Sequence, residues 1–445
     1  MRCDIIRITA TLLIGADPQM TKILLLTADF PFSSGEVFIE NEMLAFSRME
    51  NLSMDILPTR IYHSSPSDKP TRTLPDNVRL REDVRSGISG VRYAAYMAAA
   101  LFSRPFWGEM KALRRKGRLS RSAFFKSLAF AARGEYVYRR LKKLYAKEIK
   151  AGELIVYSYW MTFPSYAAAR LAERCGVPAV SRAHGGDLYN ERTALGFQPM
   201  RGYTLEHLSA AYPCSELGAA YLRERYPAAE KSIACARLGT NDHGERQLSA
   251  PFSERKELVI ASCSSVIPLK RVWLIAEALK SAGDCPIRWY HFGGGEEKEL
   301  ARLREVCAGL PQNVTFVEMG GVKNSELMDF YRDNDVHLFI NASTLEGVPV
   351  SIMEAISFGI PSIAVDAGAS GEVVRPAHGV LLDSLPEAEL TAALSAAISR
   401  FAGMDDAEYA TMRKAAREYW TERYNSQTNY TAFYNKLIDS SGGHR

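Results

Sequence analysis

The chain of 445 residues is long enough for two or three hydrophobic cores, and its 47% hydrophobic and 24% charged residues are ordinary for a soluble α/β protein. It has no run of about 18 apolar residues, so no membrane-spanning helix is predicted. Its seven cysteines form no C-x-x-C pair and no metal-ligand spacing, so we expect reduced thiols in a cytosolic protein and no metal site.

Residues 1–19 resemble a signal peptide only superficially. They contain two arginines and a short apolar run, but no small-residue cleavage site precedes the first strand, which should begin at Lys22 or Ile23. Met20 stands where a start codon would naturally precede that strand. We expect residues 1–19 to be a dispensable extension or a misassigned start.

The first two buried strands are expected over 23–27 and 54–58, and the segment between them carries the first candidate site residues. Gly35 can bring backbone close to a ligand, and Glu36 places a polar group near the end of the first strand. A plain glycine turn before a helix that begins near Glu36 explains the same residues equally well. Both interpretations stay open from this segment alone.

Residues 91–150 are expected to form a basic helical insertion. Between residues 104 and 143, thirteen Lys or Arg accompany only Glu109 and Glu135, and because the whole chain carries a net charge of +4, this charge is a local patch. Interleaved aromatic residues such as Trp107 and Phe125 make the segment suit an anionic membrane surface. Two alternatives stay open: a packed insertion with solvated charges, and a nucleic-acid surface, for which no binding motif is present.

The alternation of strands and helices then resumes and leads to a candidate histidine. Strands are expected over 154–158, 179–182, 211–214 and 231–238, with a helix over 167–174. The second of these strands ends in AHGGDLYNER, where His184 precedes two glycines. Such a ring can hydrogen-bond a sugar hydroxyl or a phosphate. We favour this role over a packed core ring because sites of α/β sheets lie at strand ends.

A second domain is expected behind a linker. The polar residues 241–255 are typical of an interdomain linker. Behind them, strands are expected over 258–263, 287–292 and 314–317, helices over 271–281 and 324–332, and terminal helices over 386–402, 405–423 and 429–438. Two βα series joined by a linker predict two doubly wound domains that face a cleft.

Cations and glycines follow the first two strands of this second domain. Lys270 and Arg271 stand where cations meet a diphosphate, although an ordinary surface lysine is the alternative for Lys270. Gly293 and Gly294 belong to a triple glycine that lets backbone approach a base or ribose. It lacks the G-x-G-x-x-G spacing and is therefore no dinucleotide-binding fingerprint.

The segment 336–365 carries the most chemistry. A buried strand over 336–340, a polar loop, a helix to about residue 358 and a strand over 361–365 form a β-loop-α-β unit. Glu346 and Glu354 should face one crevice, and free N–H groups near Gly347 to Ser351 with the helix dipole form an anion site. Since carboxylates repel phosphates, their partners should be hydroxyls, and a nucleotide sugar has all of these groups.

Six segments of the chain from Thr21 onward carry a family resemblance. They are SSGEVFIENE, YSYW at 157–160, SRAHGGDLYNER at 181–192, RLGTND at 237–242, SSVIPLKRV at 264–272 and STLEGVPVSIMEAISFGIPSIA at 343–364. In this order they resemble retaining glycosyltransferases of family 4 with the GT-B fold, particularly the bacterial exopolysaccharide and colanic-acid-type subgroup. The E-x7-E element in its EGxPxSxxEA context is the specific signal.

The resemblance implies an α/β protein with two Rossmann-like domains facing a cleft. It makes residues 20–240 the acceptor domain, residues 256–424 the nucleotide-sugar domain, and residues 425–445 a helix that crosses back to pack on the first domain. It also implies transfer of a sugar from a nucleotide diphosphate sugar with retained anomeric configuration, without a metal ion or other cofactor.

The resemblance also implies residue roles. Glu346 contacts the donor sugar, Glu354 holds the ribose, and His184 and Lys270 match the family histidine and lysine. The family arginine is missing at Ser265, and Arg271 is the hypothetical replacement of its charge. The catalytic candidates are His184, Glu346 and Lys270; the donor-binding candidates are Gly35, Lys270, Arg271, Gly293, Gly294, Glu346, Gly347, Val348, Pro349, Val350 and Glu354; the acceptor-side candidates are Glu36, Asp187 and Tyr189.

The expected partners follow from these assignments. They are a nucleotide diphosphate sugar, a polyprenyl-diphosphate-linked or other glycan acceptor, and an anionic membrane surface through residues 104–143, with no nucleic acid. The expected location is the cytoplasmic face of a bacterial cell membrane, in surface or exopolysaccharide biosynthesis. Two alternatives stay open: a nucleotide-sugar 2-epimerase on the same fold, and a non-catalytic membrane-associated assembly factor, which the departure at Ser265 supports.

Overall fold

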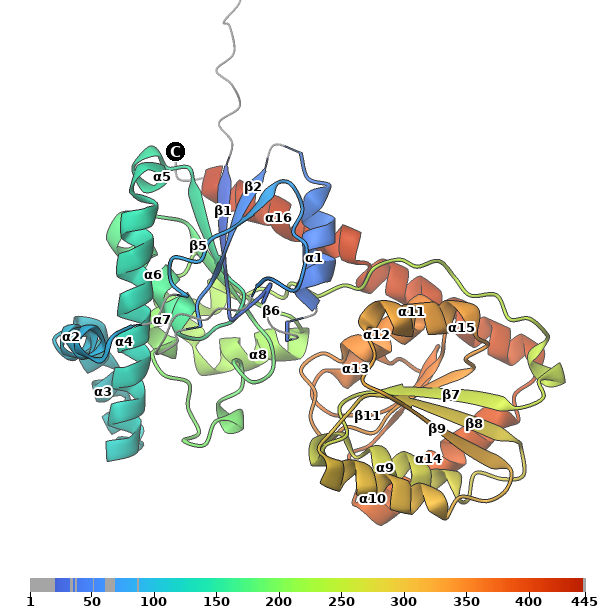
Figure 1. Ribbon diagram of the computed structural model, residues 1–445. Helices are drawn as coiled ribbons and strands as arrows, with labels where there is room; N and C mark the ends of the chain where they lie inside the picture. Colours follow the sequence, from blue (N-terminus) through green and yellow to red (C-terminus); the bar gives the residue numbers. More distant parts are fainter. Residues whose placement is uncertain are drawn as a thin grey trace, which may run out of the picture.

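Two parallel sheets of six strands, each flanked by helices, make up the protein (Figure 1). The computed structural model describes residues 21–32, 35–36, 38–50, 52–60, 69–85 and 88–442. The expected extension at residues 1–19 lies outside these ranges. Two sheets with flanking helices confirm the predicted fold of two doubly wound α/β domains.

The sheet of the N-terminal domain is entirely parallel. Its strands, in spatial order, are β3 (Val78–Leu80), β2 (Ser53–Pro58), β1 (Lys22–Thr27), β4 (Leu154–Ser158), β5 (Ala179–Ala183) and β6 (Ala210–Pro213). Ile23 and Leu25 of β1 pack into one hydrophobic cluster and Leu24 and Leu26 into another, because alternate side chains of a strand point to opposite faces. The central strand is thus buried on both sides.

Two details of this sheet differ from the sequence prediction. The short edge strand β3 was not predicted. The segment expected as a strand over 231–238 runs along β6 without forming a regular strand: it has an isolated bridge between Ile233 and Ala211, and the N–H groups of Ala234 and Ala236 donate to the Ala211 and Pro213 carbonyls at 3.1 and 2.9 Å. The carbonyl of Ala236 accepts a hydrogen bond from Arg182 Nη1, at 2.6 Å, so a side chain takes the place of a further strand there.

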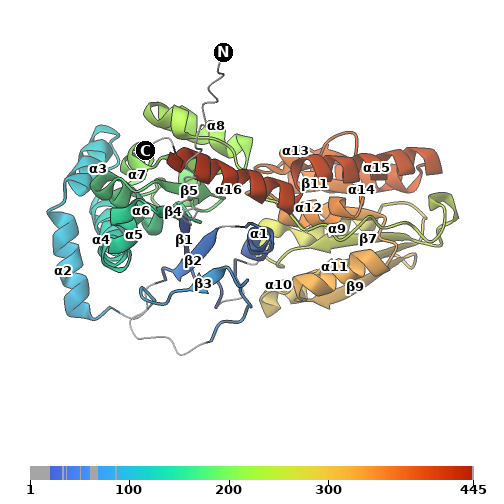
Figure 2. The ribbon, with the colours of Figure 1, turned by 90° about the horizontal axis from the view of Figure 1, so that it is seen from above.

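The insertion consists of four helices: α2 (Gly90–Leu101), α3 (Arg104–Arg115), α4 (Arg121–Leu144) and α5 (Ala146–Ala151). The side chains of Ser89, Ser103 and Ser120 cap the first three by accepting a backbone N–H bond three residues on. Phe106 and Leu128 belong to the buried core of the insertion. Figures 1 and 2 show α2 and α3 at the end of the molecule away from the C-terminal domain.

The other helices of the N-terminal domain cover its sheet. They are α1 (Phe38–Ser47), α6 (Phe163–Cys175), α7 (Arg201–His207) and α8 (Glu216–Arg225), with short 3-10 helices at Asn190–Arg192 and Pro227–Ser232. Gly176, with φ +68°, ends α6 in the left-handed conformation that glycine adopts without strain. Among the described helices, none is both long and apolar enough to cross a membrane.

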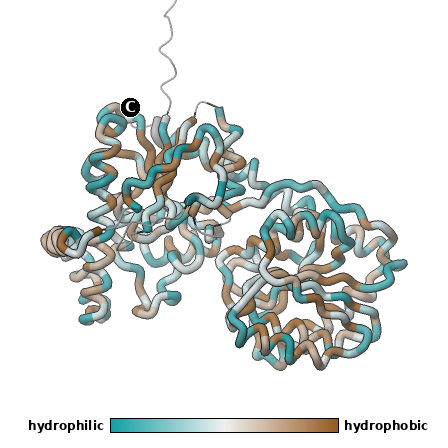
Figure 3. Tube along the Cα trace, viewed as in Figure 1, coloured by the Kyte–Doolittle hydropathy of each residue, from teal (hydrophilic) through white to brown (hydrophobic). Residues whose placement is uncertain are grey.

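The sheet of the C-terminal domain has the same strand number and is also parallel. In spatial order its strands are β12 (Gly379–Leu382), β11 (Ser362–Val365), β10 (Leu338–Asn341), β7 (Leu258–Cys263), β8 (Ile287–Phe292) and β9 (Val314–Gly320). The helices are α9 (Val272–Leu279), α10 (Glu297–Ala308), α11 (Asn324–Asp333), α12 (Val350–Ser357), α13 (Ser370–Val373), α14 (Glu387–Ala402) and α15 (Asp406–Arg423). Helix α10 was not predicted, whereas β7 and β8 have the predicted bounds. Figure 3 shows hydrophobic segments in the middle of both domains.

The last helix, α16 (Ser426–Gly442), returns to the N-terminal domain, as predicted (Figure 2). Tyr430 and Phe433 are buried in the cluster that contains α1, and the hydroxyl of Tyr434 donates to Glu42 at 2.8 Å. Thr240 pairs with the turn between α15 and α16, since its N–H donates to the Tyr424 carbonyl at 2.9 Å. The two chain crossings between the domains therefore lie side by side.

Candidate functional site

The predicted site residues of the two domains meet where the loops after β5 and β10 approach each other. A Cβ added to Gly347 would lie 3.4 Å from the amide nitrogen of Gly185 and 3.8 Å from the carbonyl carbon of His184. An added Cβ would therefore just fill the space between the two backbones, which leaves no room there for a larger side chain. This close approach brings the histidine loop of the N-terminal domain to the turn that precedes α12, as the sequence predicted.

On the C-terminal domain, Lys270 and Glu346 form a close ion pair. Lys270 Nζ lies 2.6 Å from Glu346 Oε1, and Asn341 Nδ2 donates to the same oxygen at 3.2 Å. Glu346 is buried and Lys270 is half-buried. The structure therefore brings together two predicted catalytic residues that are far apart in the sequence, and it adds Asn341, at the end of β10, which was not predicted.

Glu354 lies inside α12 and is also buried. Burial raises the pKa of Glu354 to about 7, against the opposing effect of a hydrogen bond from Asn324 Nδ2 at 2.7 Å. A carboxyl group that titrates near neutral pH can either accept a hydrogen bond from a hydroxyl or donate one. Asn324, the first residue of α11, was missed because nothing in its local sequence points to a partner thirty residues away.

The turn from β10 into α12 contains Gly347, Val348, Pro349 and Val350, all predicted donor-binding residues. Pro349 is the N-cap residue, and the N–H groups of the first helical turn, beginning at Val350, cannot have an acceptor four residues back in the helix. Gly368, with φ +59°, packs so closely that a Cβ there would overlap the carbonyl of Glu346. The loop after β11 thereby supports a turn whose amides suit an anion.

Arg271 is buried behind the start of α9. It adopts φ 47° as the N-cap of this helix, and its Nε donates to the carbonyl of Ala342 at 2.9 Å. Burial lowers the pKa of Arg271, and the charge that opposes this effect is Glu387, at the start of α14. The Arg271 Nη2 has no hydrogen-bond partner within the described chain, and the replacement by Arg271 of the charge missing at Ser265 stays a hypothesis.

The triple glycine after β8 is explained by a contact between two loops. A Cβ on Gly293, with φ +147°, would overlap the carbonyl of Ser264, and a Cβ on Gly295 would overlap that of Val266. The Val266 N–H donates to the Gly294 carbonyl at 2.9 Å. The close backbone approach predicted for Gly293 and Gly294 therefore exists in the protein, with the loop after β7 as its partner.

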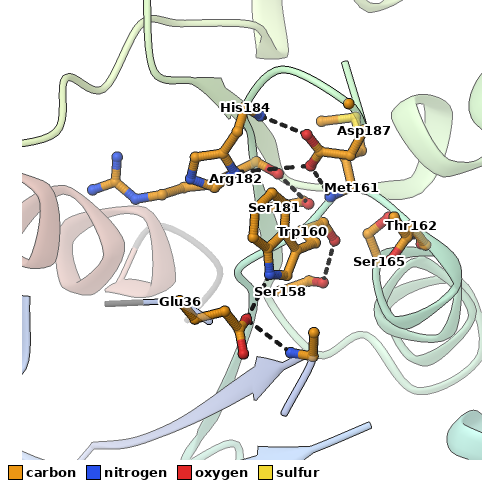
Figure 4. A network of polar contacts seen from close by, with 12 residues as sticks. Glu36, Ser158, Trp160, Met161, Thr162, Ser165, Ser181, Arg182, His184 and Asp187 are labelled. Atoms are coloured by element: carbon orange, nitrogen blue, oxygen red, sulfur yellow. Dashed lines mark hydrogen bonds and ion pairs between the residues drawn. The ribbon is translucent and has the colours of Figure 1, made fainter. Parts of the chain in front are cut away.

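On the N-terminal domain, His184 packs against aromatic rings, of which Figure 4 shows that of Trp160. Its ring centroid is 4.6 Å from that of Trp160 and 4.7 Å from that of Tyr159. The ring is buried, and within the described part of the chain neither ring nitrogen makes a hydrogen bond; Nδ1 is 3.9 Å from Asp187 Oδ2. Two unused ring nitrogens at the domain contact suit a sugar or phosphate partner.

Asp187 holds this loop in place. Its two oxygens accept the backbone N–H groups of His184 and Met161, each at 2.8 Å. Burial would raise the pKa of Asp187, but its contacts with His184 and the Met161 amide hold the pKa below its usual value. Asp187, predicted on the acceptor side, thus positions His184 relative to the loop after β4.

Glu36 likewise has a loop-closing role. Its carboxylate accepts the backbone N–H groups of Ala28, Asp29 and Phe30 at 2.7 to 3.0 Å and the Trp160 indole N–H at 2.6 Å. Four donors occupy the four acceptor positions of a carboxylate. This arrangement favours the structural alternative that the sequence left open, a turn before a helix that begins near Glu36, since α1 begins at Phe38 and the Ile39 N–H donates to the Glu36 carbonyl at 3.0 Å.

Two further candidates lie beside these groups. Gly35 is exposed and directly precedes Glu36, which itself has φ 58°. The ring of Tyr189 packs edge-on against Tyr221, with centroids 4.8 Å apart, and lies 4.8 Å from the guanidinium carbon of Arg192. Tyr189 therefore supports Arg192, which was part of the matched segment but was not predicted as a site residue.

The sequence of the chain is similar to those of known glycosyltransferases. Residues 257–400 match the family model described as "Glycosyl transferases group 1". Over 396 residues the chain is 21% identical to TuaC of Bacillus subtilis (strain 168), named as a glycosyltransferase of teichuronic acid biosynthesis, covering 85% of this chain and 89% of TuaC. Over 255 residues it is 29% identical to WcaL of Escherichia coli (strain K12), named as a glycosyltransferase of colanic acid biosynthesis, covering 55% of this chain and 60% of WcaL.

Solved structures show the same fold at low sequence identity. The lipopolysaccharide outer core galactosyltransferase WaaB in its apo form superposes with a TM-score of 0.64 at 15% identity, over 94% of this chain and 99% of WaaB. Anabaena Alr3699/HepE in complex with UDP and glucose superposes with a TM-score of 0.57 at 16% identity, over 94% of this chain and 100% of that chain. The two-domain arrangement is therefore that of these GT-B proteins.

Proposed function

We propose that the protein is a retaining glycosyltransferase of family 4 that moves a sugar from a nucleotide diphosphate sugar to a glycan acceptor in bacterial surface polysaccharide biosynthesis. The observation that carries this proposal is the Lys270–Glu346 ion pair, which joins the loop after β7 to the turn before α12, the turn whose Gly347 lies beside the His184 loop of the other domain. The group 1 match over residues 257–400 and the names of TuaC and WcaL support it.

The donor fits this site group by group. The N–H groups at the start of α12 and the ammonium of Lys270 bind the diphosphate, since both attract anions. Glu346 takes a hydroxyl of the donor sugar, and Glu354, with its pKa near 7, takes the ribose hydroxyls. HepE, a structural neighbour, was solved with UDP and glucose, which supports a nucleotide-sugar donor.

The reaction breaks the bond between the anomeric carbon and the oxygen of the β-phosphate. Negative charge grows on the departing diphosphate, where Lys270 and the amides from Gly347 onward stabilise it. The acceptor hydroxyl oxygen forms the new bond on the same face, and its proton passes to the departing phosphate oxygen. No carboxylate nucleophile, metal ion or cofactor is required by this scheme, so it differs from the two-carboxylate route of retaining glycosidases.

The acceptor is a polyprenyl-diphosphate-linked glycan at the cytoplasmic face of the cell membrane. Three aromatic side chains of the insertion are exposed to solvent: Phe102 (85%), Trp107 (54%) and Phe125 (61%). Exposed cations lie along α3, at its C-cap and at the start of α4, namely Arg104, Lys111, Arg114, Arg115, Lys116 and Arg121. Aromatic anchors within a basic field suit an anionic lipid surface, and we call these nine residues the α2–α4 surface.

The nucleic-acid alternative has no comparable support. The Phe102, Trp107 and Phe125 side chains stand among cations without a recognisable nucleic-acid-binding motif. The alternative of a fully packed insertion holds for Phe106 and Leu128, which are core residues, and not for these three.

Incubation with a panel of UDP- and GDP-sugars and membrane lipid extract, followed by mass spectrometry, tests the proposal. We expect release of nucleoside diphosphate together with a lipid-linked product that is one sugar heavier. A 2-epimerase would instead yield an isomeric sugar nucleotide without any acceptor. An assembly factor would leave every donor intact and would show no thermal stabilisation by UDP or GDP, and either result would overturn the transferase proposal.

A further inference from the structure

The diphosphate site of the C-terminal domain is short of positive charge. Lys270 is already paired with Glu346 at 2.6 Å, and the buried Arg271 has Glu387, at the start of α14, as its charged neighbour rather than Glu346. A departing nucleoside diphosphate carries at least two negative charges, and helix N–H groups supply only partial charges against them. A further cation at the turn before α12 would complete the site.

Arg192 of the N-terminal domain reaches this turn. It ends the 3-10 helix Asn190–Arg192, and its Nη2 donates to the carbonyl oxygen of Glu346, one residue before Gly347. The guanidinium also lies directly against Gly185, where an added Cβ would overlap Nη1. Arg192 therefore lies where Gly185 and Gly347 approach each other, at the turn that leads into α12.

The position of Arg192 is fixed before any ligand arrives. Its guanidinium carbon lies 4.8 Å from the Tyr189 ring centroid. Asn190 begins the same 3-10 helix, two residues before Arg192. Two hydrogen bonds fix it: its N–H donates to the Tyr221 hydroxyl at 2.8 Å, and its Oδ1 accepts the Gln198 N–H at 3.1 Å. A cation held in this way loses little freedom when it binds an anion.

The electrostatic surroundings of Arg192 favour an anionic partner. Burial lowers the pKa of Arg192, with Tyr189 and Glu346 acting in the opposite direction, and a guanidinium remains charged at neutral pH. Within the described part of the chain, the guanidinium makes one hydrogen bond, to the Glu346 carbonyl. A guanidinium has five N–H donors, so donors remain for phosphate oxygens.

We propose that Arg192 is a diphosphate-binding residue that the N-terminal domain contributes across the domain interface. Its guanidinium binds a phosphate oxygen of the donor and balances the charge of the leaving group once the two domains are together. This inference rests on the proposed function. The anion site is then formed by residues of both domains.

A purely mechanical role is the competing explanation, since Arg192 also joins the domains. Glu372 provides a matched control for it, because its carboxylate accepts the N–H groups of Glu216 and Leu217 at 3.0 and 2.7 Å, at the start of α8. It therefore links the same two domains through different residues. Loss of a mechanical link should affect every ligand alike, whereas loss of a phosphate contact should depend on the number of phosphates.

Calorimetric titration with UDP, UMP, GDP and GMP separates these explanations. For Arg192→Ala we expect diphosphate affinity to fall about 10- to 100-fold, the range for a lost charged hydrogen bond, with a clearly smaller loss for the monophosphate of the same base. Arg192→Lys should recover part of the loss, and Glu372→Ala should leave the ratio of diphosphate to monophosphate affinity at the wild-type value.

The outcomes distinguish this inference from the proposed function. If Arg192→Ala keeps the wild-type affinity ratio, or if Glu372→Ala lowers the ratio to the same extent, the phosphate role of Arg192 is overturned while the transferase proposal stands. If the wild-type protein binds neither diphosphate, both are overturned. Arg192→Gln serves the same comparison if circular dichroism shows that the alanine variant is unfolded.

Discussion

Lys270 Nζ and Glu346 Oε1 lie 2.6 Å apart, so the cation proposed for the diphosphate and the carboxylate proposed for the sugar are bound to each other. Both groups are largely removed from water, where an ion pair is strong and the loss of one partner is costly. Donor binding must therefore exchange this ion pair for contacts with the diphosphate and with a sugar hydroxyl. This exchange predicts opposite effects on nucleotide affinity for substitutions of the two residues.

Replacing Glu346 by glutamine should separate nucleotide binding from sugar transfer. The Glu346→Gln side chain keeps the shape but releases Lys270, so UDP or GDP should bind as tightly as to the wild type or a few-fold more tightly. The transfer rate should fall about 100-fold or more, because the group that positions the sugar is altered.

Lys270→Ala is the partner variant and should weaken the same nucleotide about tenfold or more. Calorimetry and initial rates measure both effects. Weaker nucleotide binding by Glu346→Gln, or unchanged binding by Lys270→Ala, would contradict the exchange of partners.

The raised pKa of Glu354 predicts a pH dependence of stability. Because the pKa is about 7 in the folded protein and near 4.5 when unfolded, the folded state holds the extra proton, and stability falls as pH rises from about 4.5 through 7. The loss amounts to at most roughly 3 kcal/mol. Glu354→Gln should remove this slope.

Urea unfolding at pH 5, 6, 7 and 8 measures the slope in both proteins. Parallel curves for wild type and Glu354→Gln would show that this carboxyl does not titrate in the predicted range. Asn324→Ala, which removes the 2.7 Å hydrogen bond that opposes the shift, should steepen the wild-type slope.

Much of the fold was predictable because apolar runs mark buried parallel strands directly. The strands β7 and β8 have the predicted bounds, Leu258–Cys263 and Ile287–Phe292. The crossing helix α16 also occurs, because its aromatic residues need an apolar partner surface and find it at α1. The short strand β3, with three residues, carries too little pattern to stand out.

The candidate site was predictable where its chemistry is local in sequence. Glu346, Glu354 and the turn between them belong to one segment, so their spacing sufficed. Asn324, Asn341 and Arg192 were missed because their roles depend on contacts between separate loops. The sequence could not reveal that the Glu36 carboxylate accepts hydrogen bonds from three backbone N–H groups and from an indole N–H.

Glu354→Ala should weaken nucleotide binding while leaving pyrophosphate binding intact. Glu354 is proposed to hold the ribose, and pyrophosphate has none, so the two ligands report on different parts of the site. We expect a loss of about tenfold for UDP or GDP and a change of less than twofold for pyrophosphate, as measured by calorimetry. Unchanged nucleotide affinity would remove Glu354 from the site.

The α2–α4 surface should bind anionic vesicles. Co-sedimentation with phosphatidylglycerol-containing vesicles should retain the wild type, and neutral phosphatidylcholine vesicles should not. Charge reversal at Arg114, Arg115 and Lys116 should release the protein, because each cation near such a surface contributes roughly 1 kcal/mol. Serine at Phe102, Trp107 and Phe125 should weaken binding further at high salt, where charge is screened and apolar contact remains.

Charge reversal at Lys256, Lys298 and Lys414, three exposed lysines of the C-terminal domain, is the matched control and should leave vesicle binding unchanged. Equal release by both sets of substitutions would mean that net charge alone governs binding. Retention of the Arg114, Arg115 and Lys116 variant in the vesicle pellet would remove the membrane role of this surface, and preferential binding of RNA by the wild type would favour the nucleic-acid alternative.

The anomeric configuration of the product tests the central claim most directly. Proton NMR of the reaction with the preferred nucleotide sugar reads the coupling constant of the new glycosidic bond. The account predicts an α-configured linkage from an α-linked donor, made by the wild type and lost at least about 100-fold in Glu346→Gln. An inverted linkage, or equal turnover by Glu346→Gln, would contradict it.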